Sequence, residues 1–163
     1  MGTATPKRTS KSTRFDSRQQ EAYLALWRTY DRLRAFEDDL FARWDLTAQQ
    51  YNVLRLLHSS HPVAVPTLSL VARMVSRAPD VTRMLDKLET AERIARTRSL
   101  ADRRAVLVGL TESGLALLDE IAEPLRECHE KQLGHLSATE LSSLIALLKV
   151  ARGPHETAES VWR

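Results

Sequence analysis

Side chains able to hydrogen-bond to DNA bases recur on one face of a short helical pattern at residues 79–90. The opposite face is apolar, with spacings of three and four, at Val81, Met84, Leu85 and Leu88. Arginine can bond guanine, aspartate can accept from the amino group of cytosine, and a threonine methyl can contact thymine. Many surface helices carry such residues, so the position of this helix in the chain has to decide its role.

A second short helical pattern, at residues 67–75, precedes it with a gap of about three residues. We expect Thr67 to cap this first helix, and its inner face to hold Leu68, Val71, Ala72 and Val75. Pro79 and Asp80 suit the first turn of the following helix. Two helices joined by so short a turn form a helix-turn-helix. The predicted DNA contacts of the second helix and its approach are Ser76, Arg77, Pro79, Asp80, Thr82, Arg83 and Lys87.

An arginine-rich loop between two strand-forming runs follows this pair of helices. Ile94 and residues 106–108 flank the loop and predict a β-hairpin, which after a helix-turn-helix is a wing. Arginines at its tip could enter a minor groove, and an aspartate two residues earlier could hold a guanidinium through a charge-assisted pair. The predicted wing residues are Arg96, Arg98, Asp102, Arg103 and Arg104.

Positive charge is concentrated in the same region. Between Arg73 and Arg104 there are nine basic and five acidic residues, and residues 1–18 hold five basic residues and one acid, although the whole chain carries only +3. A basic region on an otherwise acidic chain favours a polyanionic partner, while a solvated charged face remains the alternative.

Two segments, PDVTRMLDKLE at 79–89 and DRRAVLVGLTESG at 102–114, resemble the MarR family of winged-helix transcriptional regulators. The resemblance implies that the helix near Pro79 enters the major groove and that Asp102 and Arg104 take the wing roles, with Arg104 in the minor groove. It also implies release from DNA by a small molecule. The family often has a glycine between reading helix and wing, whereas this chain has Glu92-Arg93-Ile94, so we expect the helix to end by another geometry.

Long helical patterns flank the winged region. The first, residues 17–43, would span roughly 40 Å, and a stripe that outruns its own domain predicts a dimer interface. Thr47 with Gln50, and Ser137 with Glu140, predict two capped helix starts. The segment 61–66 reads as a connector with a short strand, and Pro124 is expected to kink the helix after Thr111. Trp27, Tyr30, Trp44 and Tyr51 either line a ligand pocket or pack in the core or interface.

Sequence motifs of catalysis or cofactor binding are missing: there is no glycine-rich phosphate loop, no His-Glu-x-x-His and no Cys-x-x-Cys. We therefore expect no enzyme, cofactor or metal site. The nearest metal-ligand set is Cys128, His129 and His135, of which the first two are adjacent. Cys128 is expected to be an inert buried thiol, although the family resemblance leaves an oxidation sensor open. No apolar run of membrane-spanning length or secretory signal appears, which predicts a cytoplasmic protein without a membrane partner.

Together these features predict a mostly α (α+β) winged helix-turn-helix fold with long N- and C-terminal helices that form a dimerisation body. The expected divisions are a flexible basic tail at 1–16, a helical dimerisation region at 17–46 and 111–153, the winged helix-turn-helix at 47–110 and a C-terminal tail at 154–163. The predicted function is a homodimeric, sequence-specific regulator of transcription on double-stranded DNA, a repressor relieved by a small-molecule effector. The alternative is a dimeric protein-interaction module whose winged helix no longer reads DNA.

Overall fold

The computed structural model describes residues 15–75, 80–99, 102, 104–157 and 160. The chain divides into two compact units, Met1–Ala35 and Phe36–Arg163, and each is described by itself. Helix α1 (Arg18–Phe41) begins in the first unit and ends in the second, which confirms the predicted first helix. Its apolar side chains in the first unit are exposed except for the half-buried Leu33, with Trp27 and Tyr30 each 60% exposed.

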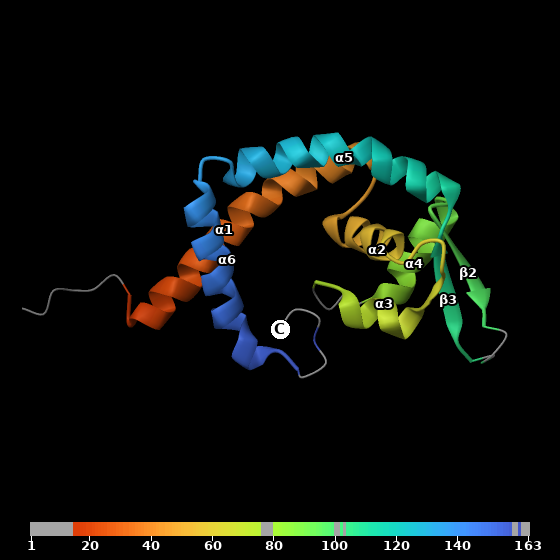
Figure 1. Cartoon of the computed structure of the whole chain (residues 1–163), viewed down its shortest axis with the longest axis horizontal. Helices are drawn as coiled ribbons and strands as arrows, with labels where there is room; N and C mark the ends of the chain where they lie inside the picture. The colour runs from red at the N-terminus through yellow and green to blue at the C-terminus, as the bar shows by residue number, and fades with distance from the viewer. Residues whose placement is uncertain (1–14, 76–79, 100–101, 103, 158–159, 161–163) are drawn as a thin grey trace, which may run out of the picture. The chain divides into compact units, whose positions relative to one another are not determined.

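The second unit holds the remaining elements (Figure 1). In chain order they are η1 (Ala42–Trp44), α2 (Ala48–His58), β1 (Val65–Pro66), α3 (Thr67–Arg73), α4 (Val81–Thr90), β2 (Ile94–Arg98), β3 (Val106–Leu110), α5 (Glu112–Leu133), α6 (Ala138–Arg152) and η2 (Gly153–His155). The three strands form an antiparallel sheet in the order β1-β3-β2, in which Val65 pairs with Val108 and Ile94 with Leu110. A mostly helical winged helix-turn-helix is therefore confirmed.

Helix α2 lies at the centre of the core, in contact with α3, α4, α5 and β3. The largest fully buried side chains of the second unit come from seven different elements and are Phe41, Val53, Leu54, Leu57, Leu70, Leu85, Leu88, Ile94, Val108 and Ile121. Burying one such side chain stabilises the fold by about 1.5–3 kcal/mol. Helix α4 and the β2–β3 hairpin therefore pack against the same hydrophobic core.

Side-chain caps begin several helices, and those of α2 and α6 were predicted. Thr47 and Gln50 form a reciprocal capping box at α2, and Ser137 and Glu140 form another at α6. Thr111 caps α5 by accepting from the backbone N–H of Gly114 at 3.0 Å. Helix α5 continues past Pro124 to Leu133.

The predicted inner face of α3 was wrong. Leu70 and the following Met74 are buried, whereas Leu68 is 84% exposed and Val71, Ala72 and Val75 are also exposed. Four of the seven residues of this short helix are apolar, three of them in succession, so their spacing did not identify a single buried face. Thr67 is not its cap either: the N-cap is Pro66, and the Thr67 hydroxyl donates to the carbonyl of Val106 at 3.1 Å.

Candidate nucleic-acid interface

Helix α4 presents a polar face to solvent while its other face is anchored in the core. Met84, Leu85 and Leu88 are buried, and Thr82, Arg83, Asp86 and Lys87 are exposed. The Asp80 carboxylate accepts from the backbone N–H of Arg83 at 2.9 Å, so Asp80 caps the helix instead of lying in its first turn. The predicted contacts Ser76, Arg77 and Pro79 lie outside the described residues.

Contacts from α2 hold the chain where it leaves α3. The Arg73 guanidinium donates to the hydroxyls of Ser59 and Ser60 at 2.8 and 3.2 Å, and the backbone N–H of Val75 donates to the Asn52 side chain at 3.4 Å. The loop after α2 therefore binds the Arg73 guanidinium, and this contact attaches the end of α3 to that loop.

The C-cap of helix α4, Ala91, is followed by a residue with left-handed backbone geometry, Glu92, whose φ is 57°. The backbone N–H of Arg93 donates to Leu88 and that of Glu92 donates to Glu89, both at 2.9 Å. These two bonds form a Schellman motif, which usually has glycine at the left-handed position. Our expectation of another helix ending was wrong: Glu92 adopts the glycine-type geometry, at a backbone cost of about 1–2 kcal/mol.

The joint after α4 is fastened to the start of α5. The Arg93 guanidinium donates to the hydroxyl and the carbonyl of Ser113, at 2.7 and 3.3 Å. A side chain at Gly114 would place its Cβ 2.2 Å from the carbonyl oxygen of Arg93, so only glycine leaves room for this close approach. The Thr-Glu-Ser-Gly segment at 111–114 thus caps α5 and binds Arg93 at the base of the wing.

The wing is the hairpin of β2 and β3, in which Arg98 pairs with Val106. In its loop the Asp102 carboxylate accepts from the backbone N–H of Arg104 at 2.9 Å, and the backbone N–H of Asp102 donates to the Ser99 hydroxyl at 3.2 Å. We expected this carboxylate to hold the Arg104 guanidinium, and that expectation was wrong: the contact between the two residues is made through the backbone. Asp102 therefore shapes the loop and leaves the guanidinium to project.

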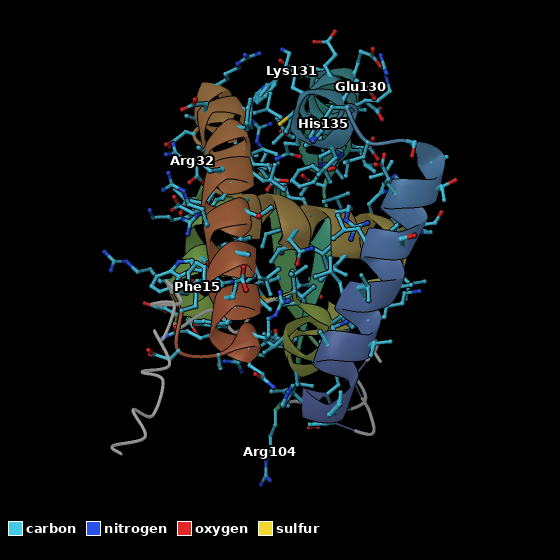
Figure 2. The ribbon with its side chains drawn as sticks, turned by 90° about the vertical axis from the view of Figure 1, so that its left-hand side faces the viewer. Phe15, Arg32, Arg104, Glu130, Lys131 and His135 are labelled. Atoms are coloured by element: carbon cyan, nitrogen blue, oxygen red, sulfur yellow. The ribbon has the colours of Figure 1, made fainter. Side chains whose placement is uncertain are left out.

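The cations of the wing differ in exposure. Arg98 and Arg104 are exposed, and Figure 2 shows the Arg104 side chain pointing away from the ribbon. Arg103 lies outside the described residues. Arg96 is only partly exposed, because its guanidinium binds carboxylates of α4: Nε lies 2.8 Å from Glu89 Oε2, and a terminal nitrogen lies 2.6 Å from Asp86 Oδ1.

The Arg96 pairing has an electrostatic signature. Hydrogen bonds from Arg96 lower the pKa of the Glu89 carboxyl, and those carboxylates in turn raise the pKa of Arg96. The sequence reading missed Glu89, which lies three residues after Asp86 and so on the same edge of the helix. That spacing indicated a paired acidic site, but its partner on β2 depends on the packing of the hairpin.

Two grooves border α4. One, of about 420 Å³, is lined by Thr82 and Leu85 of α4, by Leu68 of α3, and by Arg96, Arg104 and Val106 of the wing. The other, of about 780 Å³, lies on the η1 and α2 side and includes Trp44, Gln50, Arg83, Lys87 and Arg93 in its lining. Both grooves combine apolar walls with basic side chains, and the larger one also includes the carboxylates of Asp45 and Asp86 in its lining.

The four aromatic residues predicted as a ligand pocket have different surroundings. Trp44 lines the larger groove and donates to Glu120 at 2.9 Å. Tyr51 stacks on Phe41 with ring centroids 4.8 Å apart, and burial raises the pKa of its hydroxyl. Trp27 and Tyr30 belong to the first unit. A shared pocket for the four remains a prediction.

The remaining candidate chemistry lies on α5. Cys128 is buried, and burial raises the pKa of its thiol, which disfavours the reactive thiolate. His129 Nε2 lies 3.5 Å from Glu37, which accounts for the acidic interruption of the apolar stripe of α1. Among the described residues there is no cluster of three potential metal ligands. In that same part of the chain, no helix has the length and apolar character to span a membrane.

A helix-turn-helix followed by a two-stranded hairpin defines the class of winged-helix proteins. The sequence model of the MarR family matches residues 46–106. The transcriptional repressor NicR of Pseudomonas putida is 30% identical over 138 residues, 85% of either chain. The chain belongs to the MarR family of transcriptional regulators.

Two solved structures show the same fold. A MarR transcription factor from Planctomyces limnophilus has 52% identity and a TM-score of 0.67, with 84% of this chain and 99% of that chain covered. BpsR of Bordetella bronchiseptica has 27% identity and a TM-score of 0.72, with 80% of this chain and 98% of that chain covered. The BpsR structure concerns the regulation of its DNA binding by 6-hydroxynicotinic acid.

Proposed function

We propose that this MarR-family chain is a sequence-specific transcriptional repressor that binds double-stranded DNA as a homodimer. The observation that carries the proposal is the exposed polar face of α4, which lies beside a hairpin with exposed Arg98 and Arg104. The face of α4 would read base edges in the major groove, and Arg104 would enter the adjacent minor groove.

The proposed contacts of the reading helix and its approach are Ser76, Arg77, Pro79, Asp80, Thr82, Arg83 and Lys87, and those of the wing are Arg98, Asp102, Arg103 and Arg104. Arg96, also predicted as a wing contact, is left out of this set because Asp86 and Glu89 bind its guanidinium. Basic side chains would supply the salt-dependent affinity for phosphates, and contacts to base edges the sequence preference. We expect a protein with this role to be cytoplasmic. We also expect it to act as a regulator and not as an enzyme.

The proposed dimer is supported by apolar surface on the terminal helices. Helix α6 has no buried residue, and it exposes Ile145, Leu147 and Val150, the second of them to 68%. In the first unit α1 exposes Tyr23, Leu26 and Trp27. Exposed apolar residues of this number are typical of a protein-protein interface. Two reading helices in such a dimer would contact half-sites about one helical turn apart, roughly 34 Å.

Relief by a small molecule is the remaining part of the proposal. Its support is the relative BpsR, whose DNA binding is regulated by 6-hydroxynicotinic acid, together with the basic, partly apolar grooves beside α4. A ligand that binds the free protein better than the DNA-bound one would weaken DNA binding by that difference in affinity.

The experiment is a gel shift with duplexes selected from random sequence by the purified chain, followed by a salt titration. A preferred site, bound with a steep loss of affinity as salt rises, is the expected result. If no sequence is enriched and the protein remains a dimer by light scattering, the proposed function is overturned in favour of a dimeric protein-interaction module.

A further inference from the structure

Among the wing arginines that the structure describes, Arg96 of β2 donates hydrogen bonds to carboxylates of α4. We propose that Arg96 is a positioning residue: by binding Asp86 and Glu89 it sets the wing against the reading helix and makes no DNA contact itself. This inference rests on the proposed DNA-binding function.

Carboxylates of α4 bind both the side chain and the backbone of Arg96. Besides the guanidinium contacts, the backbone N–H of Arg96 donates to Glu89 Oε1 at 3.2 Å. Glu89 therefore receives a hydrogen bond from the main chain of β2 at one oxygen and from the guanidinium at the other. Three bonds from a rigid, planar guanidinium and one from the strand restrict rotation of β2 relative to α4 more than a single ion pair would.

Burial and register support the same role. The Arg96 side chain is 25% exposed, and Arg96 pairs across the sheet with Val108, which is fully buried. Arg98, two residues further along the same strand, is exposed. The hairpin is thus fixed at Arg96, and its tip with Arg104 extends beyond that fixed point, so a small rotation at Arg96 would displace the tip.

Charge gives a second reason for the pairing. Asp86 is on the exposed side of α4, and Glu89 is next to it on the same edge. Unpaired, these carboxylates would repel DNA phosphates beside Arg83 and Lys87. Arg96 offsets one of these two negative charges from the strand side and leaves the two basic side chains of the helix for DNA.

The test compares Arg96→Ala with the matched variant Arg98→Ala and with the charge swap Glu89→Arg/Arg96→Glu, on a site selected by the wild-type protein. We expect Arg96→Ala to weaken specific binding roughly tenfold without changing the slope of affinity against salt. Arg98→Ala, as a phosphate contact, should reduce that slope by about one. The swap should recover most of the lost affinity, and hydroxyl-radical footprints should show loss of wing protection in Arg96→Ala and its return in the swap.

Each outcome is decisive once folding is verified by circular dichroism. Wild-type affinity in Arg96→Ala, a salt slope reduced by about one in that variant, or a swap weaker than Arg96→Ala would overturn the positioning role. If Arg96→Ala does not fold, Glu89→Gln, which removes the charge and keeps the shape, replaces it and should also lose wing protection without a change of salt slope. Absence of any selected site would instead overturn the proposed function itself.

Discussion

The hydroxyl of Thr111 donates to the main-chain carbonyl of Glu92 at 2.7 Å, and thereby ties the N-cap of α5 to the residue that follows the C-cap of α4. The backbone N–H of Thr111 also donates to the carbonyl of Arg93 at 3.2 Å. The start of α5 therefore fixes the path of the chain between reading helix and wing, including the left-handed backbone at Glu92.

Replacing Glu92 with glycine should stabilise the protein. The positive φ at Glu92 costs a residue with a side chain about 1–2 kcal/mol, and the greater flexibility of unfolded glycine returns part of the gain. We expect Glu92→Gly to raise the free energy of unfolding by about 0.5–1 kcal/mol, measured in urea. The matched control is Ala91→Gly, where φ is −81° and glycine should only destabilise. A less stable Glu92→Gly would show that the Glu92 side chain contributes more than the backbone costs.

Gly114→Ala should have the opposite effect. The added methyl would sit 2.2 Å from the Arg93 carbonyl oxygen, so either α5 or the base of the wing has to move. We expect a loss of about 2–3 kcal/mol in the free energy of unfolding. Gly109→Ala is the control, since its Cβ would meet Ala64 at an ordinary 3.4 Å and should change stability little. Equal stability of the two variants would contradict the close approach at Gly114.

Much of this architecture could be predicted because it depends on interactions between residues that are close in the sequence. The capping boxes at Thr47 and Ser137 join residues three apart, and the helix-turn-helix and hairpin follow from apolar spacing and strand propensity. The buried face of α3 could not be predicted, since six of the eight residues from Leu68 to Val75, in α3 and just after it, are apolar.

The candidate site could be predicted only in part, because some of its contacts depend on the packing of one element against another. The exposure of the polar face of α4 and of Arg104 could be predicted from their positions in the helix-turn-helix and the wing. The carboxylates that bind Arg96 lie seven and ten residues away, on another element, so only the packing of hairpin against helix brings them together. The same holds for Asp102, whose carboxylate binds the Arg104 backbone where the sequence suggested the guanidinium.

The stabilisation contributed by Glu89 should depend on pH. Because Arg96 lowers the pKa of Glu89 in the folded state, the pairing stabilises the fold above the ordinary glutamate pKa of 4.5 and is lost as the pH falls through the lower folded value. Wild type should therefore be more stable than Glu89→Gln at about pH 7, with the difference shrinking at about pH 3.5. In an Arg96→Ala background the difference should be small at both pH values. A difference that grows on acidification would contradict the lowered pKa.

Arg104→Ala should weaken DNA binding without loss of the fold. Arg104 projects from the wing tip, where a guanidinium can enter a narrow minor groove. We expect a loss of roughly 1–3 kcal/mol in binding free energy by gel shift, largest for sites with A·T-rich flanks. Arg152→Ala on α6, outside the winged helix-turn-helix, is the control and should bind DNA as wild type does. Unchanged affinity of Arg104→Ala at physiological salt would remove Arg104 from the interface.

Arg83→Ala should relax sequence preference as well as affinity. Arg83 is exposed on α4, and its backbone N–H is held by the cap at Asp80, so its side chain leaves the first turn of the reading helix. If it bonds the O6 and N7 of a guanine, the variant should lose about 1–3 kcal/mol on the selected site and much less on a site changed at that base. Repeating the selection from random duplexes with Arg83→Ala measures this directly, since one position of the recovered motif should lose its preference. An unchanged motif with uniformly weaker binding and a smaller salt slope would identify Arg83 as a phosphate contact instead.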